Sequence, residues 1–169
     1  MGAAGVDVTG RSWRLGGLAA ILAVTYVAAG AGAIASVNAA RFYAALAKPG
    51  WAPAPWVFGP VWTVLYTLIA IGAWMVVGYE GWRGARLQLI LYGVQLVVNA
   101  SWTWLFFALH SGSGAFVDIV ALVVLIIATL IAFWRVRPLA GALLAPYLAW
   151  VMFASALTWS IWMLNPGTL

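Results

Sequence analysis

The chain lacks cysteine and has very few charged residues. Of its 169 residues, eight are basic and three are acidic, so 7% are charged, against about 25% in an average soluble domain. So few charges cannot cover the surface of a soluble fold, which excludes a soluble enzyme. The basic residues are too sparse for a nucleic-acid-binding surface. Without cysteine there are no disulfide bonds, thiolate metal ligands or thiol nucleophiles.

Residues that carry acid–base or metal chemistry are almost as scarce. One histidine and three carboxylates leave no plausible ligand set for a metal ion and no acid–base pair for ordinary catalysis. We therefore expect neither catalytic residues nor a metal site. His110 is the one imidazole that could ligate a haem iron. Its place in the Gly/Ser-rich turn 110–114 favours a solvated loop residue instead.

Apolar residues, by contrast, are abundant. They make up 66% of the chain, and the mean hydropathy is +1.06. A membrane-spanning helix needs about 20 mostly apolar residues. The apolar runs here are continuous, whereas barrel strands would alternate polar and apolar residues. The sequence predicts an all-α membrane protein in which residues 1–169 form a single domain. Its five transmembrane helices are expected near 15–36, 57–79, 87–109, 115–136 and 139–164.

The connections between these helices differ in length. The turns at 80–86, 110–114 and 135–138 are short, so consecutive helices should be antiparallel neighbours. Residues 37–56 form a long loop that is rich in proline and tryptophan. Pro146 falls inside the last helix and should bend it, because proline removes a backbone donor.

The basic residues predict an orientation in the membrane. Six arginines fall on the side of the N-terminus and only two basic residues on the other side. Cytoplasmic segments carry the excess of positive charge. We therefore expect a cytoplasmic N-terminus, with loop 37–56 and the C-terminus on the opposite side. The six arginines are Arg11, Arg14, Arg83, Arg86, Arg135 and Arg137, and the other two residues are Arg41 and Lys48.

Aromatic residues gather in and after the first loop. Residues 48–66 read KPGWAPAPWVFGPVWTVLY. Prolines stiffen the start of this segment, so that Trp51 and Trp56 could form a rigid aromatic lid or serve as anchors at the membrane interface. Phe58, Trp62 and Tyr66 follow at intervals of four residues and share one helix face.

A second stripe follows the third predicted helix, where Gln95, Asn99, Trp102 and Phe106 share a face. An amide deep in the membrane should face protein or a cavity. Asn99 could therefore contact a ligand or form an interhelical hydrogen bond, and the aromatic residues could simply pack. The fifth helix presents Trp150 and the small Ala154 on one face.

In this order along the chain, these motifs resemble the TspO family, the tryptophan-rich sensory proteins related to the mitochondrial translocator protein. The resemblance rests on KPxW in the first loop, PVWTxLY in the second helix, NxxW and LFF in the third, and PYLAW in the fifth. It implies a five-helix bundle whose ligand pocket opens toward the first loop. It also implies that the pocket residues are Trp51, Tyr66, Asn99, Trp102, Phe106, Trp150 and Ala154, with Trp62 as a further candidate.

The resemblance further implies a receptor or sensor that binds a porphyrin, such as protoporphyrin or haem, as a ligand and needs no obligatory cofactor. Alternative functions are light-dependent porphyrin degradation and the transport of porphyrins or other hydrophobic molecules. No basic residue follows Arg137, so the C-terminal sterol pattern is absent and sterol binding is not carried over. The small residues 28–33 could pack inside the bundle or at a homodimer face.

Overall fold

The apolar runs form five helical segments that are long and apolar enough to cross a membrane. The computed structural model describes the backbone of residues 8–169 and the side chains of residues 15–169, and within these residues it contains helices and no strand. The predicted fold class, an all-α bundle with five membrane crossings, is confirmed. The side chains of Arg11 and Arg14, on which the predicted orientation partly depends, lie outside the described residues.

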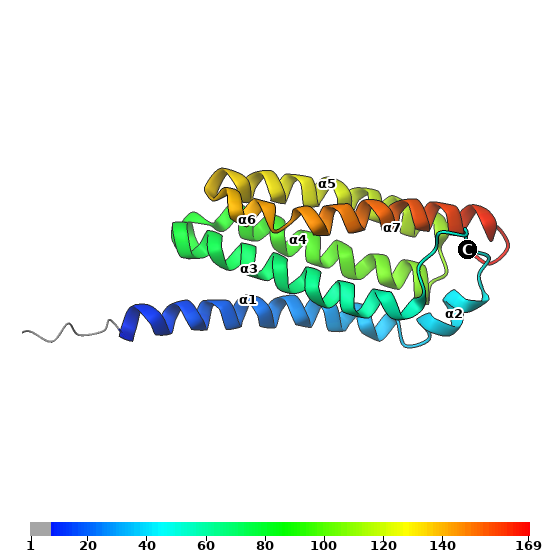
Figure 1. The fold of residues 1–169 in the computed structure, drawn as a ribbon, viewed down its shortest axis with the longest axis horizontal. Coiled ribbons are helices and arrows are strands. Elements are labelled where there is room, and N and C mark those ends of the chain that lie inside the picture. The colour runs from blue at the N-terminus through cyan, green and yellow to red at the C-terminus, as the bar shows by residue number, and fades with distance from the viewer. Residues whose placement is uncertain (1–7) are drawn as a thin grey trace, which may run out of the picture.

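The crossings lie side by side along the length of the molecule, with α1 along one edge next to α3, and α5 and α7 along the opposite edge (Figure 1). Their bounds are α1 Val8–Ala35, α3 Phe58–Gly84, α4 Arg86–Thr103 with the π-helix η2 Trp104–Ala108, α5 Gly112–Val136, and the pair α6 Pro138–Ala142 and α7 Ala145–Leu164.

The first loop is more ordered than the sequence predicted. It contains a short helix, α2 (Ala39–Ala45), and a single 3-10 turn, η1 (Pro55–Val57). Alanine and arginine favour helix, and the first proline of the loop comes only at Pro49. The Lys48 ammonium donates hydrogen bonds to the carbonyls of Tyr43 and Leu46, at 2.6 and 2.8 Å. It thereby satisfies carbonyl groups that the end of α2 leaves free.

The last crossing is interrupted where proline predicted a bend. α6 ends at Ala142 and α7 begins at Ala145, which places Pro146 in the first turn of α7. A proline is tolerated there, since the first backbone N–H groups of a helix have no partner within it. The break therefore lies just before the proline. The third crossing contains a feature that the sequence did not reveal. Its last turn is the π-helix η2.

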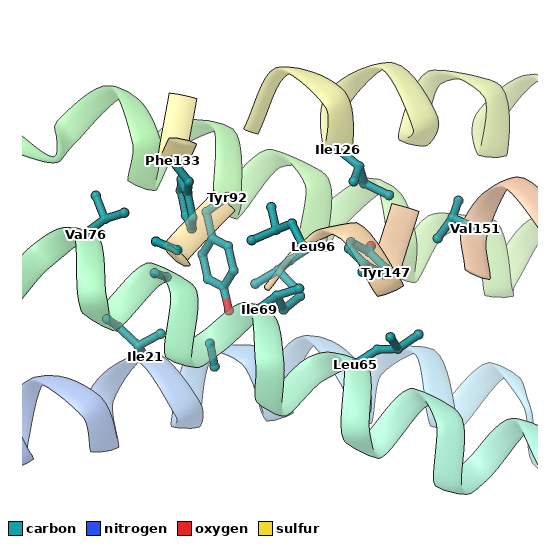
Figure 2. Packing of buried hydrophobic residues seen from close by; sticks show 14 of the residues in the cluster. Ile21, Leu65, Ile69, Val76, Tyr92, Leu96, Ile126, Phe133, Tyr147 and Val151 are labelled. Carbon is teal, nitrogen blue, oxygen red and sulfur yellow. The ribbon is translucent and has the colours of Figure 1, made fainter. Parts of the chain in front are cut away.

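The core lies between α3 and the helices that surround it. Figure 2 shows Ile69 and Val76 of α3 facing Leu96 of α4 and Phe133 of α5. Small residues let the backbones approach closely: a Cβ built on Gly72 would lie 3.0 Å from the carbonyl oxygen of Ala140. Membrane helices use small residues in this way, because lipid supplies no hydrophobic force that drives helices together.

Three segments that are distant in sequence meet at the α2 end of the bundle (Figure 1). The side chain of Asn165 accepts a hydrogen bond from the Ala47 N–H and donates one to the Ala47 carbonyl, both at 2.9 Å. The ring of His110 stacks on Phe42 of α2 with their centroids 4.2 Å apart. The first loop, the α4–α5 turn and the C-terminus therefore share one end, as the predicted antiparallel order requires.

Candidate ligand-binding cavity

A cavity of about 600 Å³ lies at the α2 end of the bundle, between α1, α2, α3, α4 and η2. Four of the eight residues that the family resemblance implied line it: Trp62, Tyr66, Asn99 and Trp102. They come from two helices, and their spacing brings them to a common face, with Tyr66 one turn after Trp62 and Trp102 one turn after Asn99.

Asn99 is the polar centre of the cavity wall. Tyr66 donates its hydroxyl proton to Oδ1 of Asn99 at 2.6 Å, and Nδ2 of Asn99 donates to the Tyr147 hydroxyl at 2.9 Å. The amide therefore joins α4 to α3 and to α7. The sequence left open whether Asn99 lines a pocket or forms an interhelical hydrogen bond, and in the structure it does both.

Aromatic rings form the walls on either side of this amide. Trp62 stacks on Tyr66 with 5.3 Å between ring centroids and 29° between planes. Trp102 stacks on Phe106 at 5.5 Å and 13°. Such rings present apolar faces to which flat conjugated molecules can stack.

A second, much smaller cavity of about 20 Å³ lies beside the first, and Phe106 and Ala154 line it. The two cavities have four lining residues in common: Tyr43, Phe58, Trp102 and Phe107. We call these four residues the aromatic partition. They separate the face that contains Asn99 from the face that contains Ala154, so the implied site is divided in this structure.

The two remaining implied residues line neither cavity. Trp51 is 50% exposed and packs its edge against Phe153 at 5.6 Å. Trp150 lies between Phe58 and Phe153, at 5.9 and 5.3 Å. Trp150 thus packs on Phe58 of the aromatic partition, and contact between either tryptophan and a ligand stays a prediction.

Several residues that line the cavity were not predicted from the sequence. The most important is Tyr43 of α2, which is 4% exposed and donates its hydroxyl proton to the Pro53 carbonyl at 3.1 Å. Burial raises the pKa of the Tyr43 hydroxyl above its ordinary value. The hydropathy pattern does not reveal Tyr43, because this residue lies in the first loop, for which the sequence predicts no regular structure. The run of small residues 28–33 was a usable signal, since Ala29, Gly30 and Ala33 line the cavity.

Fold and cavity together define a multi-pass helical membrane protein with an aromatic-lined cavity at one end of its bundle. The sequence model of the TspO/MBR family matches residues 19–163. The chain therefore belongs to the TspO/MBR family.

Named relatives agree with this assignment. The chain is 41% identical over 130 residues to the "Tryptophan-rich protein TspO" of Chlorobaculum tepidum, covering 76% of this chain and 82% of that protein. It is 41% identical over 152 residues to "Protein CrtK" of Rhodobacter capsulatus, covering 89% and 94% of the two chains. It is 40% identical over 129 residues to the human "Translocator protein", covering 75% and 76%.

Proposed function

We propose that this protein is a membrane receptor or sensor that binds a tetrapyrrole, protoporphyrin or haem, in the large cavity. The observation that carries the proposal is a single cavity whose wall combines aromatic rings with polar groups. Its volume of about 600 Å³ lies within the range of about 300–1,000 Å³ that is usual for small-molecule sites. The walls combine aromatic rings, such as those of Trp62 and Trp102, with small residues and a few polar groups, among them the amide of Asn99.

This arrangement suits a flat molecule that has an apolar face and a polar edge. Trp62, Tyr66 and Trp102 supply aromatic faces for stacking in this cavity, and the low side-chain entropy of aromatic residues makes such contacts favourable. Acidic groups of the ligand would reach the loop end. Lys48 is already bonded to backbone carbonyls there, so we expect Arg41 to pair with a carboxylate, to which a guanidinium can form two parallel bonds.

The predicted orientation places this end on the non-cytoplasmic side. It follows from the positive charges alone: Arg83, Arg86, Arg135 and Arg137 lie at the end of the bundle opposite α2.

A titration with protoporphyrin in the dark tests the proposal. The protein is reconstituted into lipid nanodiscs, and the change in porphyrin emission on binding is followed, so that removing a tryptophan does not remove the signal. We expect saturable one-site binding. The variant Trp62→Ala removes one wall residue and should weaken binding at least about fivefold, since the stacking of one aromatic ring contributes about 1 kcal/mol beyond its buried area.

The matched control is Trp134→Ala. Trp134 is also a large aromatic residue, but it is half exposed and lies near the end of α5 that is distant from α2. Its replacement should leave the dissociation constant unchanged. A change in porphyrin emission that does not saturate, or an equal loss of affinity in both variants, would show partition into lipid and contradict the proposed function.

A further inference from the structure

The large cavity has an opening on its side, between α1 and α3. We call this opening the lateral mouth and define it by Ala29, Gly30 and Ala33 of α1 and Gly59 and Thr63 of α3, all of which line the cavity. Of these five residues, all but the half-buried Ala29 are exposed. Exposed residues that also line a cavity mark the place where that cavity meets its surroundings.

The two glycines show that the lateral mouth is unobstructed. A Cβ built on Gly30 or on Gly59 would meet no atom within 4 Å. Gly32, on another face of α1, behaves differently: its Cβ would lie 3.2 Å from Oγ1 of Thr103. Helix α1 is therefore in tight contact with α4 at Gly32, whereas Gly30 and Gly59 face open space.

The lateral mouth lies at the depth of the lipid chains. At about 1.5 Å per residue, Gly30 lies about 8 Å and Tyr26 about 14 Å from Ala35, where the first spanning segment ends. The hydrocarbon core is about 30 Å thick. An opening over this range faces the acyl chains of one leaflet, on the side of loop 37–56.

A hydrogen bond between the two helices bounds the lateral mouth toward the centre of the bilayer. The Tyr26 hydroxyl lies 2.9 Å from Oγ1 of Thr67, and Thr67 in turn donates to the Thr63 carbonyl at 2.8 Å. The Tyr26 hydroxyl also donates to the Thr63 carbonyl at 3.4 Å, so Tyr26 connects α1 to α3 at this edge of the lateral mouth.

The loop end of the cavity is also lined by exposed residues, Ala40 and Pro55, but hydrogen bonds tie its segments together. Tyr43 is buried and bonded to the Pro53 carbonyl. Lys48 secures the end of α2, and Asn165 ties the loop at Ala47 to the end of α7. A ligand that entered from the aqueous side would have to break several of these bonds together, whereas the lateral mouth is already open.

We propose that ligands enter and leave the cavity from the lipid bilayer through the lateral mouth. The inference rests on the proposed function, because it names the route to that same cavity. A porphyrin dissolves in the bilayer with its ring among the acyl chains and its carboxylates at the headgroups. It would therefore reach the lateral mouth by diffusion within one leaflet, and the hydrogen bonds of loop 37–56 would stay intact.

A trapping experiment tests this route, and the absence of native cysteine makes single labelling sites clean. Ala33→Cys is loaded with protoporphyrin in nanodiscs and then modified with a bulky maleimide. Dissociation is measured as transfer to an excess of empty vesicles. We expect the adduct to slow dissociation at least tenfold. The matched control is Val27→Cys, which is on the same helix and 73% exposed but does not line the cavity; its labelling should change nothing.

A second variant tests the loop end. In Ala47→Cys/Asn165→Cys, oxidation joins the two positions that the Asn165 side chain connects in the structure. Association and dissociation should remain within twofold of the reduced protein. A tenfold slowing by this crosslink would overturn the lateral route, as would an Ala33 adduct that leaves dissociation unchanged or releases the ligand. Failure of the unmodified protein to bind saturably would instead contradict the proposed function.

Discussion

The hydrogen bonds of Asn99 allow a quantitative test of what holds the cavity wall together. In Asn99→Leu, the bonds to Tyr66 and Tyr147 are both lost. An interhelical hydrogen bond in a membrane contributes about 0.6 kcal/mol on average and about 1.7 at most. Two such bonds predict a loss of about 1.2 kcal/mol in the free energy of unfolding, with an upper bound of about 3.4. Tyr66→Phe and Tyr147→Phe should each cost about 0.6 kcal/mol.

The measurement is an unfolding titration with SDS in mixed micelles, followed by helical circular dichroism. A double-mutant cycle of Tyr66→Phe with Asn99→Leu should show a coupling of about 0.6 kcal/mol, because each single variant already removes their common bond. Tyr79→Phe is the control: Tyr79 is 72% exposed, so its change should stay within about 0.5 kcal/mol.

The same variants separate stability from binding. Tyr147 is fully buried and does not line the large cavity, whereas Tyr66 does. Tyr147→Phe should therefore lower stability and leave protoporphyrin affinity within twofold. The reasoning is refuted if the cycle shows no coupling, or if Tyr147→Phe is as neutral as Tyr79→Phe.

Two further predictions concern the packing of α5 and the anchoring of the first loop. A Cβ on Gly112 would overlap Cδ1 of Trp162 and lie 2.6 Å from its Cγ, so Gly112→Ala should lower the SDS unfolding free energy by about 1–3 kcal/mol. In contrast, Gly93→Ala, where a Cβ meets nothing within 4 Å, should raise it by up to about 1 kcal/mol; equal effects would contradict the packing. Asn165→Ala removes the hydrogen bonds that hold Ala47, so trypsin should cleave after Arg41 faster than in the unchanged protein. The control variant Thr168→Ala should be cleaved at the unchanged rate. An unchanged rate in Asn165→Ala would show that this anchor is dispensable.

Much of the fold could be predicted because membrane insertion depends on local composition. A segment crosses a bilayer when enough apolar residues follow one another, so the five crossings and their order are readable without any knowledge of packing. The break near Pro146 could be predicted for the same reason, since it depends on the chemistry of one residue. The π-helix at the end of α4 and the helix α2 could not be predicted in this way. Alanine and arginine favour helix in α2, but seven residues are too few for a hydropathy period to show.

The residues of the candidate site also fall into those that the sequence predicts and those that it does not. Tyr66 and Asn99 lie on helix faces whose spacing is visible in the sequence, and the structure brings them together across α3 and α4. Tyr43 lines the cavity from a segment without periodicity, and Trp51 and Trp150 line neither cavity despite their motifs.

The sequence by itself thus determined the environment, the number of crossings, the family motifs and the helix faces that carry polar or aromatic groups. Only the tertiary structure decided which faces meet, where the cavity is open between α1 and α3, and that the aromatic partition divides the implied site. The physical reason is that lipid solvates every apolar helix face about equally well. Hydropathy therefore places a helix in the membrane but does not choose its neighbours, and close packing and a few interhelical hydrogen bonds make that choice.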